Sequence, residues 1–277
     1  MAFGEIFRKI WSSPEKKEKE FFSFEINKEE YAKHTPNEDS SIFDLSTGLA
    51  AVSDGAGGCE GAATASKIVT DKLKVGFEKD ASDLTVEKTK EKIKAILAQA
   101  EEGLKDEAVL DAKKKNMTAT VSILKFAEGG KKAVLGQMGD SRIYLLRGKE
   151  LKQISEEDSF VSKFKKEGMA EDHPAMLKWR SIITNGITAS RVENNNFPKE
   201  FEPHLSVVEV KKGDLFLICS DGVNDNLKDE EIKNLLLSEK SELAKLLIEK
   251  AKEKMERADS DKYAKPDDAT AIIIKVK

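Results

Sequence analysis

Apolar and polar residues alternate along much of this chain in the way that half-buried β-strands require. Phe22, Phe24 and Ile26 alternate with Ser23 and Glu25, and a period of two places one side of a strand against a core. Short apolar runs predict further strands at residues 41–45, 49–53, 118–126, 133–138, 142–146, 205–210, 215–219 and 269–276. The Arg-Gly-Lys sequence at 147–149 predicts a hairpin turn.

Longer segments follow the helical period instead. We expect helices at residues 62–77, 86–112, 229–237 and 242–256. In the longest of them the apolar residues share one face: Ile93, Ile96, Leu97, Ala100 and Leu104. Successive strands joined by short turns form antiparallel sheets, and helices then cover the outer faces. The pattern therefore predicts an α+β sandwich.

Two segments stand outside this pattern. Residues 1–20 predict an amphipathic helix followed by a charged linker, because the apolar residues recur at helical spacing: Phe3, Ile6, Phe7, Ile10 and Trp11. We expect this helix to dock on its own domain; the alternative is a tether to a partner or a membrane surface, for which two basic residues are few. Residues 21–277 then form the main domain, in which residues 155–203 lack clean periodicity and are interpreted as an insert.

Composition narrows the classes of function. The 277 residues carry 47 Lys and Arg against 51 Asp and Glu, a net charge of −4, which argues against a nucleic-acid binder. Two cysteines cannot form a disulfide framework. No apolar run reaches the length of a membrane span, and charged residues interrupt the N-terminal apolar segment. We therefore expect a cytoplasmic monomer.

Acidic residues stand where predicted strands end or begin. Asp54 follows the strand at 49–53, Asp140 follows 133–138, and Asp221 follows 215–219, with Asp225 four residues later. Two further acidic sites precede strands: Asp39 and the Asp267-Asp268 pair. A single Asp-Gly pair usually marks a tight turn, but five such sites suggest carboxylates that converge at one edge. Crowded carboxylates repel one another unless cations lie between them, and oxygen ligands without clustered His or Cys favour Mg²⁺ or Mn²⁺.

Other phosphate and hydrolytic chemistries do not fit. Neither cysteine is followed six positions later by the Arg of a cysteine phosphatase, and Gly61 is followed by Ala62 rather than by the Lys of a P-loop. The glycines at 55–58 lack the last glycine of a dinucleotide fingerprint. An EF-hand loop is excluded by Val223 at a ligand position. None of the three histidines lies beside a nucleophile elbow.

Five motifs resemble, in order and context, those of the metal-dependent protein phosphatases, the protein phosphatase 2C family of serine/threonine phosphatases, in a bacterial form. They are Asn37-Glu38-Asp39-Ser40, Asp54-Gly55-Ala56-Gly57-Gly58, Gly139-Asp140-Ser141-Arg142, Ser220-Asp221-Gly222-Val223-Asn224-Asp225 and Asp267-Asp268-Ala269-Thr270-Ala271. The resemblance covers about residues 22–276 and includes 151–161. It implies two stacked antiparallel β-sheets flanked by helices, and makes residues 155–203 the flap of a phosphatase domain.

The resemblance also implies roles at the metal centre. Asp54 would bridge two Mg²⁺ or Mn²⁺ ions, and the carbonyl of Gly55 would bind one of them. Asp221 and Asp267 would bind the other ion, with Asp267 preferred over Asp268 because Asp268 stands where relatives have Asn.

Further roles lie around those two ions. Glu38 and Asp39 would hold the metal-bound water, whose pKa two ions lower. Asp140 and Asp225 would form an outer, third metal site. The substrate would be a phosphorylated protein, a kinase or its targets, and attack by water needs no covalent phosphoenzyme.

Two positions depart from the family pattern. His34 stands where relatives have the Arg that grips the substrate phosphate, and a histidine is shorter and not bidentate. At 185–187 the sequence is Asn-Gly-Ile, where relatives commonly carry Arg, so no binding residue is assigned in the flap.

Three functions remain open on the sequence. The leading hypothesis is an active phosphatase for phosphoserine and phosphothreonine. A pseudophosphatase that only binds phosphoproteins is the alternative, favoured slightly by His34 and Asp268, whereas the intact Asp54, Asp221 and Asp267 favour catalysis. A nuclease that uses two metal ions would need the same kind of carboxylate site, but the net negative charge of the chain argues against it.

Overall fold

The computed structural model describes residues 24–56, 60–78, 84–170, 173–191, 197–238 and 241–277. The helix and linker expected at residues 1–20 lie outside this part of the chain. One antiparallel sheet has the strand order β1-β12-β11-β7-β8. Its strands are β1 (Phe24–Tyr31), β12 (Ala269–Val276), β11 (Leu215–Cys219), β7 (Arg142–Arg147) and β8 (Glu150–Gln153).

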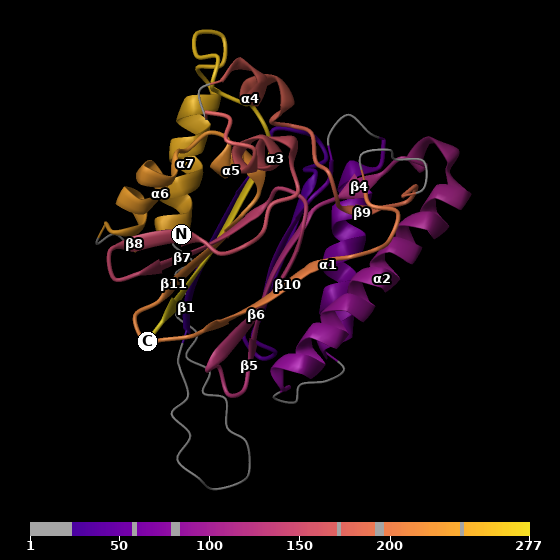
Figure 1. The fold of residues 1–277 in the computed structure, drawn as a ribbon, viewed down its shortest axis with the longest axis horizontal. Helices are drawn as coiled ribbons and strands as arrows, with labels where there is room; N and C mark the ends of the chain where they lie inside the picture. The colour runs from indigo at the N-terminus through magenta and orange to yellow at the C-terminus, as the bar shows by residue number, and fades with distance from the viewer. Residues whose placement is uncertain (1–23, 57–59, 79–83, 171–172, 192–196, 239–240) are drawn as a thin grey trace, which may run out of the picture.

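The second antiparallel sheet has the order β10-β6-β5-β3-β2. Its strands are β10 (His204–Glu209), β6 (Lys132–Met138), β5 (Val121–Ala127), β3 (Leu49–Asp54) and β2 (Asp39–Asp44). A separate two-stranded sheet pairs β4 (Thr118–Ala119) with β9 (Ile187–Thr188). The two large sheets lie face to face in the middle of the molecule (Figure 1).

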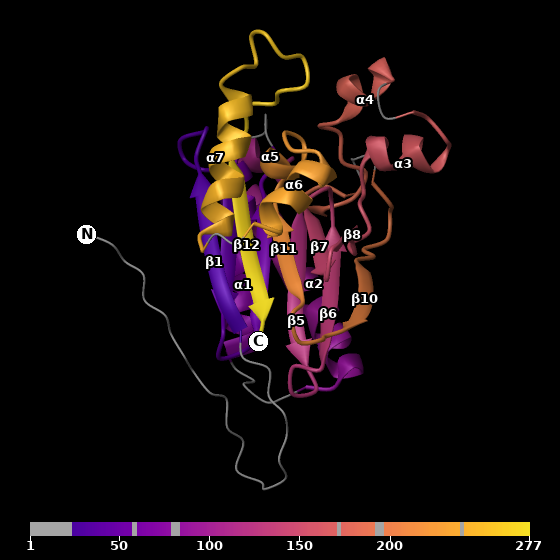
Figure 2. The same cartoon turned by 90° about the vertical axis from the view of Figure 1, so that its left-hand side faces the viewer.

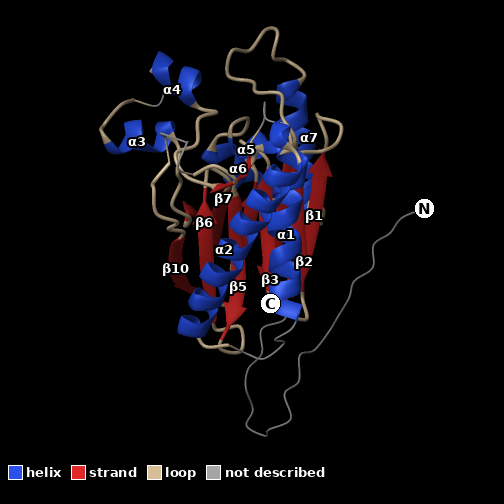
Figure 3. Cartoon of the chain, turned by 90° about the vertical axis from the view of Figure 1, so that its right-hand side faces the viewer, coloured by secondary structure: helices blue, strands red, loops and turns tan. Residues whose placement is uncertain are grey.

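Helices cover the outer face of each sheet. The helices α1 (Ala62–Glu78) and α2 (Val86–Leu110) lie across the second sheet (Figure 3); a 3₁₀ turn, η1 (Ala112–Lys114), follows α2. The helices α6 (Asp229–Leu236) and α7 (Leu243–Met255) lie across the first sheet (Figure 2). The expected sandwich of two antiparallel sheets flanked by helices is thus confirmed.

Three layers of apolar side chains hold the sandwich together. Ile93 and Leu97 of α2 are fully buried against the second sheet, and Leu247 of α7 is fully buried against the first. Between the sheets, Phe126 and Phe216 meet edge to face with ring centroids 6.0 Å apart. Burial of apolar surface on both sides of each sheet is the main source of stability.

The structure corrects the predicted elements at several points. The strand expected over 118–126 is divided at Thr120 into β4, which pairs with β9, and β5, which pairs with β3; the N–H of Thr120 itself donates to the carbonyl of Asp54 at 2.8 Å. The short strands β8 and β9 were not predicted. Three short helices were not predicted either: α3 (Phe160–Lys166), α4 (Pro174–Trp179) and α5 (Asp221–Asn224). In the described residues, no helix combines the length and apolar character needed to cross a membrane.

Candidate active site

The acidic strand ends meet at the end of the sandwich that also carries α3 and α4 (Figure 2). Asp39 begins β2 and Asp54 ends β3, and the two residues are register partners in neighbouring antiparallel strands. On the other sheet, Asp221 directly follows Ser220 at the end of β11, and Asp267 lies just before the neighbouring β12. Antiparallel pairing therefore gathers residues that are far apart in the sequence at one edge.

Two glycines allow this close approach. A Cβ atom on Gly55 would lie 2.2 Å from the carbonyl oxygen of Ala62 at the start of α1. A Cβ atom on Gly222 would lie 1.9 Å from the carbonyl oxygen of Asp268. Such distances are far below van der Waals contact, so each Asp-Gly pair serves tight packing at the edge in addition to any turn.

Ser220 joins the two sheets at the site. Its N–H donates to the carbonyl of Thr270 at 3.1 Å, and its Oγ accepts the N–H of Thr270 at 2.9 Å. The same hydroxyl donates to Oδ2 of Asp39 at 2.7 Å. The position of Asp39 is thereby fixed relative to the strand ends of the other sheet.

Asp39 and Asp221 are buried, Asp54 and Asp267 are partly buried, and their negative charges repel one another. Burial raises the pKa of Asp54 well above its usual range, and the charges of Asp39 and Asp221 raise it further. Burial also raises the pKa of Asp39 to about 8 and that of Asp267 to about 6. Among the described residues, Asp39 Oδ1 and Asp221 Oδ1 are buried without a hydrogen-bond partner. A set of buried, unpaired oxygen donors fits hard divalent cations such as Mg²⁺ or Mn²⁺.

Lys265 places a cation among these carboxylates, and sequence analysis missed it. Its Nζ lies 3.1 Å from Asp225 Oδ2 and 3.3 Å from Asp267 Oδ2, and it contacts Asp221 Oδ2. Only 13% of the side chain is exposed. Burial raises the pKa of Asp221, but the charge and hydrogen bond of Lys265 outweigh it and lower the pKa below its usual value. The one available signal was a lysine two positions before Asp267.

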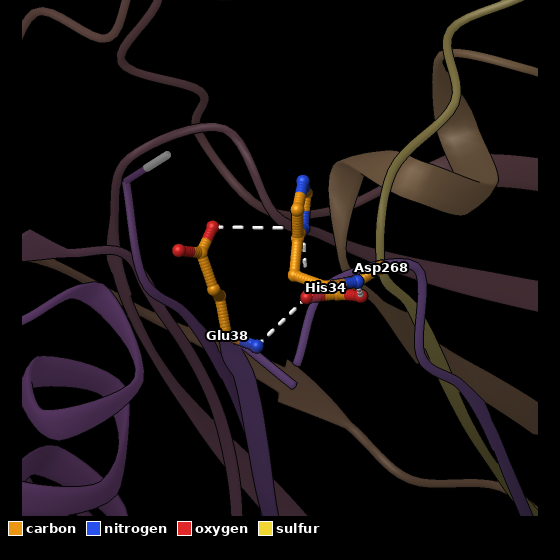
Figure 4. A group of neighbouring side chains, drawn as sticks. All are labelled: His34, Glu38 and Asp268. Carbon is orange, nitrogen blue, oxygen red and sulfur yellow. Dashed lines mark hydrogen bonds and ion pairs between the residues drawn. The ribbon is translucent and has the colours of Figure 1, made fainter. Parts of the chain in front are cut away.

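Figure 4 shows His34, Glu38 and Asp268 side by side at the rim of the site. Asp268, with only 2% of its side chain exposed, accepts the backbone N–H groups of Lys33, His34 and Glu38. Both of its oxygens are thus engaged, one of them also 3.1 Å from His34 Nδ1. This arrangement fits a clamp for the loop before β2 better than a metal ligand.

The His34 ring is 43% exposed and surrounded by acidic groups. Its Nδ1 lies 3.6 Å from Glu38 Oε2 and 3.9 Å from Asp267 Oδ1. Burial lowers the pKa of His34, but the hydrogen bond and charge of Asp268 and the nearby carboxylates raise it overall. Burial raises the pKa of Glu38, opposed by the charge of His34.

Asp140 and Asp225 extend the acidic edge outward. Burial raises the pKa of Asp140 well above its usual range, and Asp221 is the largest charge that adds to this. Asp225 follows the single turn of α5 and donates its N–H to the carbonyl of Asp221 at 2.8 Å. Arg142 borders this side, with its Nε 2.8 Å from Glu157 Oε2.

Residues 155–203 are attached to the sandwich by two arginines. Arg180, just after α4, donates to the carbonyls of Tyr263 and Ala264 at 2.8 and 3.0 Å. Arg191 is buried and pairs with Glu101 of α2.

Arg191 also reaches the stretch where relatives commonly carry Arg. Its guanidinium donates to Asn185 Oδ1 at 3.2 Å and to the carbonyl of Gly186 at 2.6 Å. Asn185 is itself buried, so these residues fasten the segment to α2 rather than face the acidic edge.

Comparisons with known proteins agree with this geometry. The family model described as protein phosphatase 2C matches residues 27–258. The serine/threonine protein phosphatase PstP of Mycobacterium tuberculosis is 32% identical over 222 residues, 78% of this chain and 39% of that protein. The chain thus spans about two fifths of that relative's length.

Solved structures show the same fold. That of the serine/threonine phosphatase Stp1 from Staphylococcus aureus has a TM-score of 0.77 at 25% identity, covering 95% of this chain and 100% of that one. That of the PstP catalytic domain in complex with two manganese ions has a TM-score of 0.71 at 28% identity, covering 92% and 98%.

Proposed function

The chain belongs to the protein phosphatase 2C family, and from that premise we propose that it hydrolyses phosphoserine and phosphothreonine in proteins with the help of Mg²⁺ or Mn²⁺. The observation that carries the proposal is the convergence of buried aspartates from both sheets, with unpaired oxygens, at one edge. All the carboxylates that the sequence motifs predicted lie in the described part of the chain. Nothing described there favours a pseudophosphatase.

We propose that the ions are held at the strand ends. Asp54, the carbonyl of Gly55, Asp221 and Asp267 would hold the two ions. The burial of Asp221 and the partial burial of Asp54 and Asp267 support this assignment, because neighbouring ionised carboxylates are costly without cations between them. When bound, divalent ions lower the pKa of an attacking water and offset charge on the phosphoryl group.

The remaining residues of the edge orient the reactants. Asp39 uses one oxygen to accept the Ser220 hydroxyl, which leaves Oδ1 to accept a hydrogen bond from the attacking water. Glu38 lies beside Asp39 at the rim and helps to hold the same water. The water oxygen bonds to phosphorus as the bond to the serine or threonine oxygen breaks, and one proton passes from the attacking water, through solvent, to the leaving oxygen.

His34 is proposed to contact the substrate phosphate. Its 43% exposed side chain, 3.9 Å from Asp267 Oδ1, supports this role, although Asp268 Oδ2 lies 3.1 Å from Nδ1. The substrates are phosphorylated proteins, including a kinase or its targets, and residues 155–203 form a flap beside them within a phosphatase domain of residues 21–277. We place the activity in the cytoplasm, on the composition of the chain.

A phosphopeptide assay tests the proposal. Metal-free protein, prepared with a chelator, is given a phosphothreonine peptide with and without Mn²⁺, beside a phosphotyrosine peptide and a DNA oligonucleotide. The proposal predicts Mn²⁺-dependent phosphate release from phosphothreonine and no cleavage of the DNA. Binding of the peptide without turnover at saturating Mn²⁺ would instead identify a pseudophosphatase.

A further inference from the structure

Lys265 carries an inference that reaches beyond the family assignment and rests on the proposed metal site. Its ammonium contacts carboxylates on two different segments, Asp221 and Asp225 around α5 and Asp267 before β12. Asp225 is one of the two residues expected to bind an outer, third ion. The ammonium therefore stands between the inner carboxylates and that outer position.

The position of Lys265 is built into the fold. The side chain of Asn226 accepts the N–H of Lys265 at 2.9 Å and donates to its carbonyl at 2.9 Å. The same Asn226 amide donates to the carbonyl of Gly222 at 2.9 Å, beside Asp221. Asn226 is 5% exposed, so buried hydrogen bonds connect the loop of Lys265 directly to the acidic turn. Arg180 holds the two preceding carbonyls from residues 155–203.

The charge of Lys265 affects how many divalent ions the acidic edge can hold. Five aspartates are assigned to metal ions, and they carry five negative charges when ionised: Asp54, Asp140, Asp221, Asp225 and Asp267. Two divalent ions neutralise four of these charges, and the buried ammonium neutralises the fifth. A third divalent ion would lie beside the ammonium, where repulsion between cations is strong because little water screens it.

We propose that Lys265 is the fixed cation of the outer position, so that this chain binds two divalent ions at its active site rather than three. In this role Lys265 is a positioning residue: it holds Asp225 and the outer side of Asp221 in place without a metal. Residues 155–203, through Arg180, help to set where the ammonium lies.

Metal stoichiometry tests the proposal independently of turnover. Bound Mn²⁺ per chain is measured by equilibrium dialysis for the wild type, Lys265→Gln, Lys265→Arg and Lys262→Gln. Lys262 is an exposed lysine of the same loop and serves as the matched control. We expect two ions in the wild type, Lys265→Arg and Lys262→Gln, and three in Lys265→Gln. Three ions in the wild type, or two in Lys265→Gln, would overturn the proposal.

A second variant keeps the test decisive if Lys265→Gln does not fold. In Asp225→Asn the count of bound Mn²⁺ stays at two if the ammonium is the outer cation. If Asp225 instead holds an outer ion, the substitution loses that ion and the count falls by one relative to the wild type.

Thermal unfolding in chelator gives a further readout. We expect Lys265→Gln to lower Tm more than Lys262→Gln, because the metal-free carboxylates lose their cation, and an equal Tm in the two variants contradicts the role. Failure of the proposed function itself is distinguishable, because the wild type would then not hydrolyse the phosphothreonine peptide, whatever its Mn²⁺ count.

Discussion

Two loops that are distant in the sequence each bring one cationic side chain to the acidic edge. The loop at 32–38 brings His34, and the loop at 256–268 brings Lys265. Each is fastened by a buried side chain that binds its backbone: Asp268 accepts three N–H groups of the first loop, and Asn226 binds the N–H and carbonyl of Lys265 in the second.

The two cations differ in exposure and in neighbours. The His34 side chain is 43% exposed and lies at the rim, whereas that of Lys265 is 13% exposed and lies between aspartates. An exposed cation can meet a substrate phosphate, and its ion pairs are screened by water. A buried cation acts on its fixed neighbours. The comparison therefore assigns substrate affinity to the first loop and metal occupancy to the second.

The largest expected effect removes the site that both loops serve. We expect Asp54→Asn to lower kcat by at least about a hundredfold and to weaken Mn²⁺ binding, since it removes the negative charge of a carboxylate that we propose holds the ions. Asp44→Asn is the matched control, because Asp44 ends the neighbouring strand β2 at the end away from the site, where it accepts the N–H of Ser46 in a turn. Phosphatase rates and calorimetric Mn²⁺ titration measure both variants. Near wild-type values for Asp54→Asn would refute the metal assignment.

The next largest effect is expected from a substitution that removes the hydrogen bonds holding the loop at 32–38. Asp268→Ala leaves the N–H groups of Lys33, His34 and Glu38 without their acceptor, which we expect to cost about 1–3 kcal/mol of unfolding free energy. Asp268→Asn is expected to cost less, because an amide oxygen still accepts. Urea unfolding in chelator provides the comparison, and equal stability of the alanine variant and the wild type would show that the clamp is unimportant.

A smaller effect, on KM alone, is expected to distinguish the role of His34 from that of Lys265. We expect His34→Ala to raise KM for a phosphopeptide about two- to fivefold, the size typical of a solvent-screened ion pair, with Mn²⁺ stoichiometry unchanged. His34→Arg should lower KM, because a guanidinium binds phosphate in a bidentate manner. Lys33→Ala, next to it and exposed, is the control. An unchanged KM in both His34 variants would assign His34 to loop structure alone.

Much of this arrangement was predictable from the sequence, for identifiable reasons. Long apolar runs such as 215–219 and 269–276 predicted central strands. The acidic residues at the ends of these runs predicted the acidic edge. β8 was missed because it is only four residues long and half exposed. The α3 and α4 helices were missed because they are too short for a helical period to emerge.

Contacts made by irregular loops were beyond prediction. Lys265 lies in a segment without periodicity, and its partner Asp221 is 44 positions away. Asp268 was compared with the family's Asn, but its contacts with backbone groups 230 to 235 positions away depend on β1 pairing with β12. Such contacts follow from the tertiary fold, which local patterns do not encode.

The smallest expected effect concerns a histidine–aspartate pair outside both loops, which gives a reference value for the free energy of an ion pair remote from the acidic edge. His204 on β10 has its Nε2 2.7 Å from Asp158 Oδ1. That hydrogen bond, opposed by burial and aided by the charges of Asp158 and Glu156, raises the pKa of His204 above its ordinary 6.5; Lys166 opposes it weakly. Stability from this pair is therefore complete below pH 6.5 and is lost as pH rises through the higher folded pKa.

The corresponding variant is His204→Gln. We expect it to cost about 0.2–1 kcal/mol at pH 5.5 and less at pH 8.5, because the pair is partly solvated. Urea unfolding at both pH values measures it, and a cost that increases with pH would contradict the sign of this pKa shift.

The most direct test of the account follows bound Mn²⁺ and phosphothreonine peptide hydrolysis together while Mn²⁺ is titrated into metal-free protein. The account predicts no hydrolysis without metal and a rate that reaches its plateau when two ions are bound per chain. Full hydrolysis by the metal-free protein, or a plateau that is reached only with a third bound ion, would contradict it.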